Sequence, residues 1–131
     1  TLPRYDIAEH KLLVDVQDVR LLIKMDSCKE DESALLDYKT GRTKWTKAKA
    51  DKDKQLTFYC MALYFKNERL PERCSIIHVE SDVDEHGDHY LTGEVYEYHS
   101  SRTLQDVFDM FVEVQKDARA ISKDYQEYLG L

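Results

Sequence analysis

Three consecutive segments in which apolar residues recur at alternate positions fill the first third of the chain, and short links join them. The first two segments are residues 8–17 and 19–27, and the third is residues 33–40, after the charged loop 28–33. A period of two is typical of a β-strand with one buried face. The polar link Gln17-Asp18 indicates a hairpin. The sequence therefore predicts an antiparallel meander of three strands.

After this meander the sequence predicts a helix, two strands and a second helix. Residues 42–54 are polar and basic, and we expect a loop or the frayed start of a helix there. From about Lys52 the apolar segment QLTFYCMALYFKN is typical of a helix packed on more than one side, and Pro71 breaks it. The later elements are a strand at residues 74–81, an acidic turn at 82–89, a strand at 89–98 and a long helix at 101–128. We expect this long helix to cover the core of the domain rather than to bind a partner. The order βββαββα predicts one domain.

Chain length and cysteine content narrow the class of protein. The chain has 131 residues, enough for a single domain with its own core. No apolar run approaches the roughly 18 residues of a membrane span, and the start TLPRYDIAEH lacks a signal-peptide pattern. Three widely spaced cysteines without a C-x-x-C pair favour reduced intracellular thiols over a disulfide framework or a metal cluster. Because there is no initiator Met, we expect a fragment or a processed piece.

Basic residues are concentrated in one stretch of an acidic chain. The net charge is −7, yet residues 39–54 carry seven lysines and arginines against two aspartates, a local charge of +5. Such a run is a solvated face in one interpretation. In the other it contacts phosphates, which binds nucleic acid without reading its sequence. The candidate DNA-binding residues are Arg42, Lys44, Lys47, Lys49, Lys52 and Lys54.

The stretch LLDYKTG at residues 35–41 ends the third strand with an acid and a base. Side chains two apart on a strand point the same way, roughly 7 Å apart along the chain, so Asp37 and Lys39 share a face. We expect Leu36 and Tyr38 on the opposite face to cover the core. Asp26, at the end of the preceding strand, is placed to approach Asp37 if the two strands pair. Taken alone, the charges have a simpler interpretation as an ion pair worth roughly 0–1 kcal/mol.

Two further residues extend this group. Gln55 and Tyr59 are four apart on the expected helix and share one of its faces. Asp26, the D-Y-K-T-G motif at residues 37–41 and this Q-x-x-x-Y motif, in that order and spacing, resemble the PD-(D/E)xK nuclease superfamily and most closely its RecB-like exonuclease branch. The resemblance covers roughly residues 9–98. It implies a restriction-endonuclease-like α/β (α+β) core over residues 1–131, in which helices flank a mixed central sheet of about five strands.

The resemblance implies a deoxyribonuclease that depends on Mg²⁺ or Mn²⁺ and acts in DNA recombination, repair or phage DNA processing. The metal would be held by Asp26, Asp37 and the backbone carbonyl of Tyr38, because these ions take oxygen ligands. Bound metal neutralises charge on the phosphodiester and helps to form hydroxide from water. A noncatalytic nucleic-acid-binding or structural module that keeps the nuclease fold is the alternative.

The remaining residues of the motif have roles in this resemblance too. Lys39 would orient the attacking water and stabilise the transition state, while Gln55 and Tyr59 would position the DNA backbone or hold the lysine. The expected partners are DNA and the rest of a larger nuclease or helicase–nuclease chain, with no membrane. The expected location is intracellular, in the cytoplasm or associated with the nucleoid.

The chain departs from the RecB-like pattern in two respects, and the first is Ile23, which stands where the family often has a Gly, three residues before Asp26. The second is that members carry an additional Glu or His on a helix before the first strand, whereas Glu9 and His10 lie on the expected first strand itself. That part of the site is therefore expected upstream of Thr1, or from elsewhere, or the site is incomplete. The later histidines fit no zinc spacing and are expected at the surface: His78, His86, His89 and His99. Trp45 is expected either to cover the core or to stack on a base.

Overall fold

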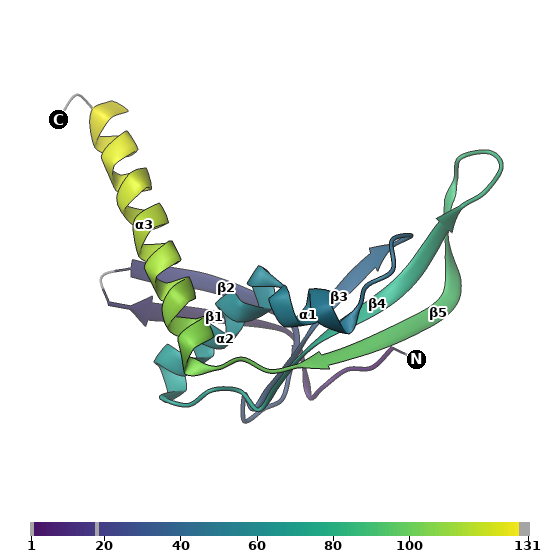
Figure 1. Ribbon diagram of the computed structural model, residues 1–131, viewed down its shortest axis with the longest axis horizontal. Coiled ribbons are helices and arrows are strands. Elements are labelled where there is room, and N and C mark those ends of the chain that lie inside the picture. Colours follow the sequence, from purple (N-terminus) through teal and green to yellow (C-terminus); the bar gives the residue numbers. More distant parts are fainter. Residues whose placement is uncertain (1, 18, 129–131) are drawn as a thin grey trace.

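The computed structural model describes residues 2–17 and 19–128, with side chains described as far as residue 120. Within these residues it contains five strands and three helices (Figure 1). They are, in order, β1 (Ile7–Val16), β2 (Val19–Cys28), β3 (Ala34–Gly41), α1 (Lys47–Lys52), α2 (Lys54–Asn67), β4 (Arg73–Val83), β5 (His89–Ser100) and α3 (Leu104–Tyr128). The predicted order is confirmed, with the short helix α1 added in a segment expected to be a loop or a frayed helix start. Asp18, half of the expected hairpin link, lies outside the described residues.

The five strands form one mixed sheet in the order β1-β2-β3-β4-β5. β1 is antiparallel to β2, and β2 is antiparallel to β3, as the predicted meander requires. β3 and β4 are parallel, and β4 and β5 are antiparallel. Parallel neighbours need a long crossover connection, and α1 with α2 supplies it between β3 and β4. The structure is therefore an α+β fold.

The main core lies where α1 and α2 pack on the sheet, and it corrects the expected orientation of β3. Leu35 is fully buried in this core together with residues of α2. Because alternate side chains of a strand share a face, Asp37 and Lys39 lie on this helix-covered side. Leu36 and Tyr38, which were expected to cover the core, face the other side. There the hydroxyl of Tyr38 donates to the carbonyl of Pro3, so the segment before β1 lies against it.

Near the place where the β1–β2 pairing is interrupted, the residues of β2 no longer alternate strictly between the two faces of the sheet. The cross-strand pairs run from Ile7–Cys28 to Val16–Val19 but skip Glu9, whose φ of 53° is in the left-handed region. Met25 and Cys28 consequently both belong to the main core, although strict alternation would place them on opposite faces. Strict alternation would point Asp26, which directly follows Met25, away from the helices. Its carboxyl group instead reaches the backbone amide of Tyr38 on β3.

The start of α2 is defined by a side-chain cap. The side chain of Asp53 accepts a hydrogen bond of 3.0 Å from the amide of Leu56. Asp53 lies between the two helices, directly after the last residue of α1 and before the first residue of α2. We expect Asp53→Ala to lower the free energy of unfolding by about 1 kcal/mol because the cap satisfies a helix amide that otherwise has no partner. Urea unfolding measures this change. Lys52→Ala, at an exposed neighbouring position, is the control, and an equal loss there would contradict the capping role.

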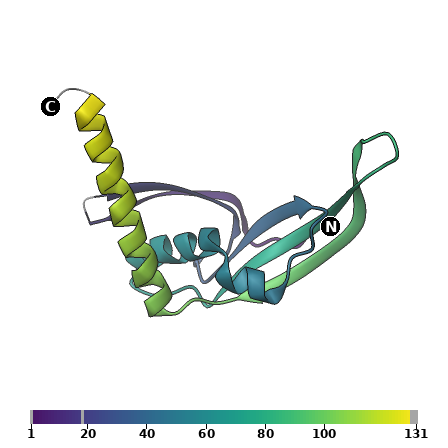
Figure 2. The ribbon, with the colours of Figure 1, turned by 45° about the horizontal axis from the view of Figure 1, so that its top comes forward.

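The long helix α3 packs on α2 and extends beyond the sheet (Figure 2). Val107 and Met110 are buried against Met61 of α2, which confirms that α3 covers the core. Three other apolar side chains of α3 are exposed by 44–50%, namely Leu104, Phe108 and Val112. No helix of the described residues is long and apolar enough to cross a membrane.

Candidate functional site

A continuous chain of polar contacts joins β3 to the first turn of α2. Lys39 Nζ lies 2.7 Å from Oδ2 of Asp37 and donates a hydrogen bond of 2.6 Å to Oε1 of Gln55. The amide nitrogen of Gln55 in turn donates to the hydroxyl of Tyr59 at 2.7 Å. Four residues that sequence reasoning singled out therefore contact one another in series.

Asp26 joins this group from β2. Its Oδ2 accepts a hydrogen bond of 2.8 Å from the backbone amide of Tyr38. β2 and β3 pair only at Ser27–Leu36 and Cys28–Leu35, so the two strands separate at the position of Asp26. Its carboxyl group fills the gap between them. The carbonyl of Tyr38 points to the same side as its amide, since both groups of a strand residue face the same neighbour.

Burial controls the charge state of Asp37. Its side chain is only 5% exposed, and this desolvation is the main reason that its pKa is raised to about 6. The contact with Lys39 lowers the pKa of Asp37, whereas the nearby carboxyl group of Asp26 raises it further. The pKa of Lys39 is also shifted: burial lowers it, but the contact with Asp37 outweighs burial and raises it. Burial likewise raises the pKa of Tyr59. Such shifts are typical of functional sites, although structural ion pairs produce them too.

One buried carboxylate oxygen of the site has no aligned hydrogen-bond donor among the described residues. This atom, Oδ2 of Asp37, is shielded from solvent, and its 2.7 Å contact with the Lys39 ammonium is an ion pair that lacks hydrogen-bond geometry. Buried polar atoms without partners are rare and are often found where a ligand binds. Two carboxyl groups and a carbonyl are the oxygen donors that Mg²⁺ and Mn²⁺ prefer. Asp26, Asp37 and the Tyr38 carbonyl therefore fit such an ion by their chemistry.

The loop after β3 covers Lys39 with an aromatic ring. Lys39 Nζ lies 5.9 Å from the centre of the Trp45 ring, within the range of a cation–π contact. Trp45 is half-buried and packs against the main core. Of its two expected roles, covering the core is confirmed, and stacking on a base stays a prediction.

The basic stretch is exposed, but acidic neighbours neutralise half of it. All six candidate DNA-binding residues are exposed. Three of them form ion pairs, Arg42 with Asp82, Lys47 with Asp51 and Lys54 with Glu113. Within the described residues, none of the ion pairs includes the other three, namely Lys44, Lys49 and Lys52.

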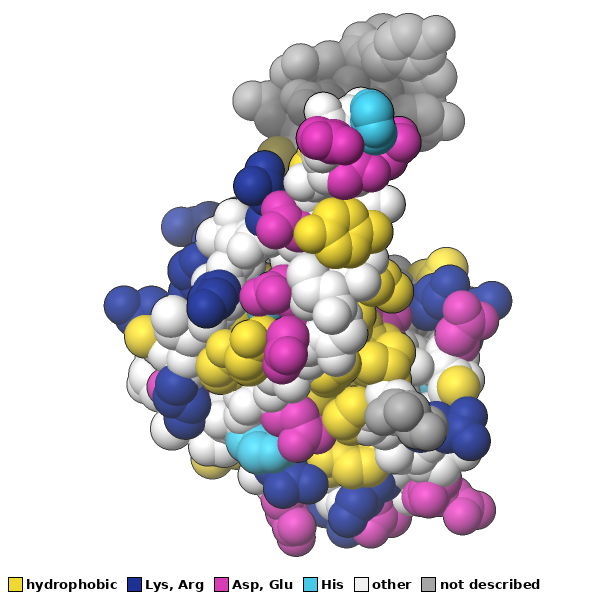
Figure 3. Space-filling view, turned by 90° about the vertical axis from the view of Figure 1, so that its right-hand side faces the viewer, with side chains coloured by type: hydrophobic (Ala, Val, Ile, Leu, Met, Phe, Trp, Pro, Cys, Tyr) yellow, Lys and Arg dark blue, Asp and Glu magenta, His cyan; other side chains and the backbone are white. Residues whose placement is uncertain are grey.

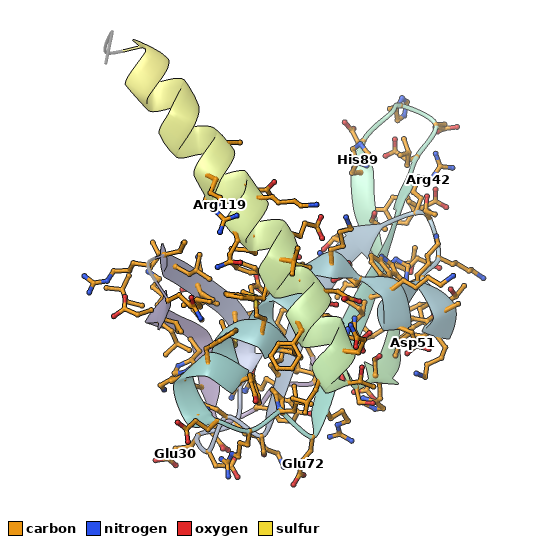
Figure 4. All side chains as sticks on the ribbon, turned by 60° about the vertical axis from the view of Figure 1, so that its left-hand side comes forward. Glu30, Arg42, Asp51, Glu72, His89 and Arg119 are labelled. Atoms are coloured by element: carbon orange, nitrogen blue, oxygen red, sulfur yellow. The ribbon has the colours of Figure 1, made fainter. Side chains whose placement is uncertain are left out.

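The surface around this stretch is uneven in charge. Figure 3, which looks at the right-hand side of Figure 1, shows acidic side chains gathered around the tip of the β4–β5 hairpin. In Figure 4 Arg42 lies toward this tip, whereas Asp51 lies on α1. The residues of the basic stretch that form no ion pair, Lys44, Lys49 and Lys52, therefore lie on α1 and in the loop before it.

Other residues considered from the sequence lie outside the site. His10 pairs with Glu32 at 2.9 Å, next to Lys66, and Glu9 lies 3.6 Å from Lys24. Neither contacts the carboxyl groups of the site. In the described part of the chain, groups of three or more His, Cys, Asp and Glu side chains placed to hold a metal ion are absent. Three predicted surface histidines are exposed, namely His86, His89 and His99.

Sequence reasoning misplaced one residue and missed another. His78 was expected at the surface but is fully buried on β4, beside Lys39 in the parallel register. The signal for this burial was the run of mostly apolar residues around His78, namely Cys74, Ile76, Ile77 and Val79. Arg102 is also buried and donates to the carbonyls of Ala50 and Asp53 and to the hydroxyl of Thr57, which fixes the corner from which α2 starts. No local pattern marks an arginine that binds backbone carbonyls far away in sequence.

Comparisons of the chain with protein-family models, with curated proteins and with solved structures found no match. A functional conclusion must therefore come from the geometry of the site and from the motif that the residues form.

Proposed function

We propose that this chain is a metal-dependent deoxyribonuclease domain of the RecB-like type, with a restriction-endonuclease-like core. The observation that supports it is the chain of contacts from Asp37 through Lys39 and Gln55 to Tyr59, with Asp26 beside it. These residues come from three separate elements, and the order of the motif alone does not require them to meet. A strand-end ion pair would need only two of them.

Each residue of the site would have a separate role in phosphodiester hydrolysis. Asp26, Asp37 and the Tyr38 carbonyl would hold Mg²⁺ or Mn²⁺, which neutralises phosphate charge and lowers the pKa of bound water. Lys39 reaches Asp37 and Gln55 at the same time, so its ammonium group is held at the carboxylates, where it would orient the attacking water and stabilise negative charge in the transition state. Tyr59 fixes the Gln55 amide and thereby the lysine.

We expect DNA to bind at the exposed lysines on α1 and in the loop before it. Lys44, Lys49 and Lys52 are exposed around α1, and the loop that carries Lys44 leads directly from β3. Contacts with phosphates would give affinity that falls with salt. We place the activity inside the cell, in DNA recombination, repair or phage DNA processing, within a larger nuclease or helicase–nuclease chain.

The test is degradation of linear DNA by the purified protein. With Mg²⁺ or Mn²⁺ we expect release of nucleotides from single- or double-stranded substrates, and none when the metal is chelated with EDTA. Gel analysis of end-labelled DNA measures this. No degradation of either substrate with either metal would overturn the proposal of an active nuclease.

A noncatalytic nucleic-acid-binding module with the same fold is the second candidate. It is favoured by the small number of acids at the site, since two carboxyl groups meet there and no group of three ligating side chains occurs in the described residues. This candidate predicts DNA binding that is unchanged in Asp26→Ala and Asp37→Ala. Calorimetric Mn²⁺ binding that disappears in both variants would count against it.

A further inference from the structure

His78 is a buried polar residue next to the site that the proposed chemistry does not use. It is fully buried on β4 and is the direct register partner of Lys39 on β3. Neighbouring residues of paired strands share a face, so His78 lies on the same side of the sheet as Lys39. Its ring stacks on Tyr96 of β5, with ring centres 5.9 Å apart and planes inclined by 23°.

A hydrogen bond to the backbone determines the tautomer of the imidazole. Nε2 lies 2.9 Å from the carbonyl oxygen of Gly41, the last residue of β3. A carbonyl only accepts, so Nε2 must carry the hydrogen and donate. Nδ1 is then an acceptor in the neutral ring, and it is buried without a hydrogen-bond partner among the described residues. Leaving such an atom unpaired is costly, which argues for a role that the packing of the strand alone does not give.

The bonded carbonyl lies where β3 passes into the loop that covers Lys39. Gly41 is two residues after Lys39, and the ring of Trp45, four residues further on, lies 5.9 Å from the lysine nitrogen. The bond to Gly41 therefore anchors both the end of the strand and the start of the loop. A lysine side chain has four rotatable bonds, and its reach to Asp37 and Gln55 depends on a fixed backbone.

We propose that His78 is a positioning residue for Lys39, which acts through its hydrogen bond to Gly41. A test by DNA turnover rests on the proposed function. A test of the environment of Lys39 rests on the structure alone. A small displacement of a reacting group lowers turnover without changing how the substrate binds.

The test uses a matched pair of variants. The side-chain amide of Gln has a nitrogen at about the distance of His Nε2, whereas the amide of Asn is too short to reach the Gly41 carbonyl. In His78→Asn we expect faster labelling of Lys39 by an amine reagent, measured by peptide mass spectrometry, with unchanged labelling of Lys54. The kcat for DNA cleavage should fall by up to roughly 10²-fold while KM stays unchanged. His78→Gln should restore most of both properties, and His86→Asn, at an exposed position, should behave as wild type.

The possible outcomes separate this inference from the proposed function. Wild-type labelling of Lys39 in His78→Asn, or equal increases at Lys39 and Lys54, would overturn it. If the wild-type protein cleaves no DNA, the proposed function fails, and the labelling result alone decides the role of His78. As a check that needs no variant, ¹⁵N NMR of the wild-type imidazole should show hydrogen on Nε2, and hydrogen on Nδ1 would refute the bond.

Discussion

Lys39→Met is expected to reduce DNA cleavage by roughly 10²–10³-fold, the loss typical of removing one group that stabilises transition-state charge. Methionine keeps much of the apolar stem that lies under Trp45 but cannot donate to Gln55 or approach a phosphate oxygen as a cation. The variant should remain folded, since the lysine side chain is 27% exposed and its carbonyl and amide stay in the sheet. Steady-state cleavage of linear DNA with Mn²⁺ measures the loss.

The same variant should bind metal at least as tightly as the wild type. The Lys39 ammonium lies 2.7 Å from Oδ2 of Asp37 and therefore competes with a cation for that oxygen. Calorimetry with Mn²⁺ in the absence of DNA tests this. Lys24→Met is the control, because Lys24 also pairs with an acid, Glu9, but lies outside the site. Equal activity of the two variants, or weaker Mn²⁺ binding by Lys39→Met, would remove Lys39 from the proposed role.

The sequence was informative about this site because its parts are local. A period of two places Asp37 beside Lys39, and a period of 3.6 places Gln55 beside Tyr59. Each rule needs only a few neighbouring residues. The two pairs meet through Lys39 and Gln55 because of the way α2 packs on the sheet. The order of the motif suggested this packing, but the periodicities did not determine it.

The orientation of the sheet was predicted less well, and the reason is physical. Both faces of β3 are buried, since Leu35 packs under α2 while Ala34 and Leu36 are buried on the other side. Alternation identifies a core face only when the other face is solvated. The position of Asp26 could not be predicted from alternation either, because the irregularity at Glu9 depends on a positive φ that no glycine signals.

The pH dependence of stability gives a second large effect, which originates at Asp37. Folding raises the pKa of this carboxyl from its ordinary value of 3.8 to about 6. The folded protein thus binds the proton more tightly than the unfolded chain. The resulting stabilisation is fully present below pH 4 and is lost as pH rises through 6. A shift of this size corresponds to about 3 kcal/mol, as an order of magnitude.

Asp37→Asn should consequently be more stable than the wild type at pH 8, by about 1–3 kcal/mol, and nearly equal to it at pH 4. The amide cannot ionise, so it avoids the cost of a buried charge, although it gives up the contact with Lys39. Urea unfolding at pH 4, 6 and 8 measures the difference. Asp88→Asn, at an exposed position of the β4–β5 turn, is the control, and its stability should run parallel to that of the wild type.

The sign of the change at pH 8 distinguishes the two interpretations of the charged end of β3. If Asp37 and Lys39 form a structural ion pair, removing one charge leaves the other without a partner, and Asp37→Asn is destabilised. If the carboxylate is kept buried for a metal ion, the variant is stabilised, while Mn²⁺ raises the stability of the wild type alone, because only a folded protein with the intact site binds it. Destabilisation at pH 8 without a Mn²⁺ effect on the wild type would leave the ion pair as the explanation.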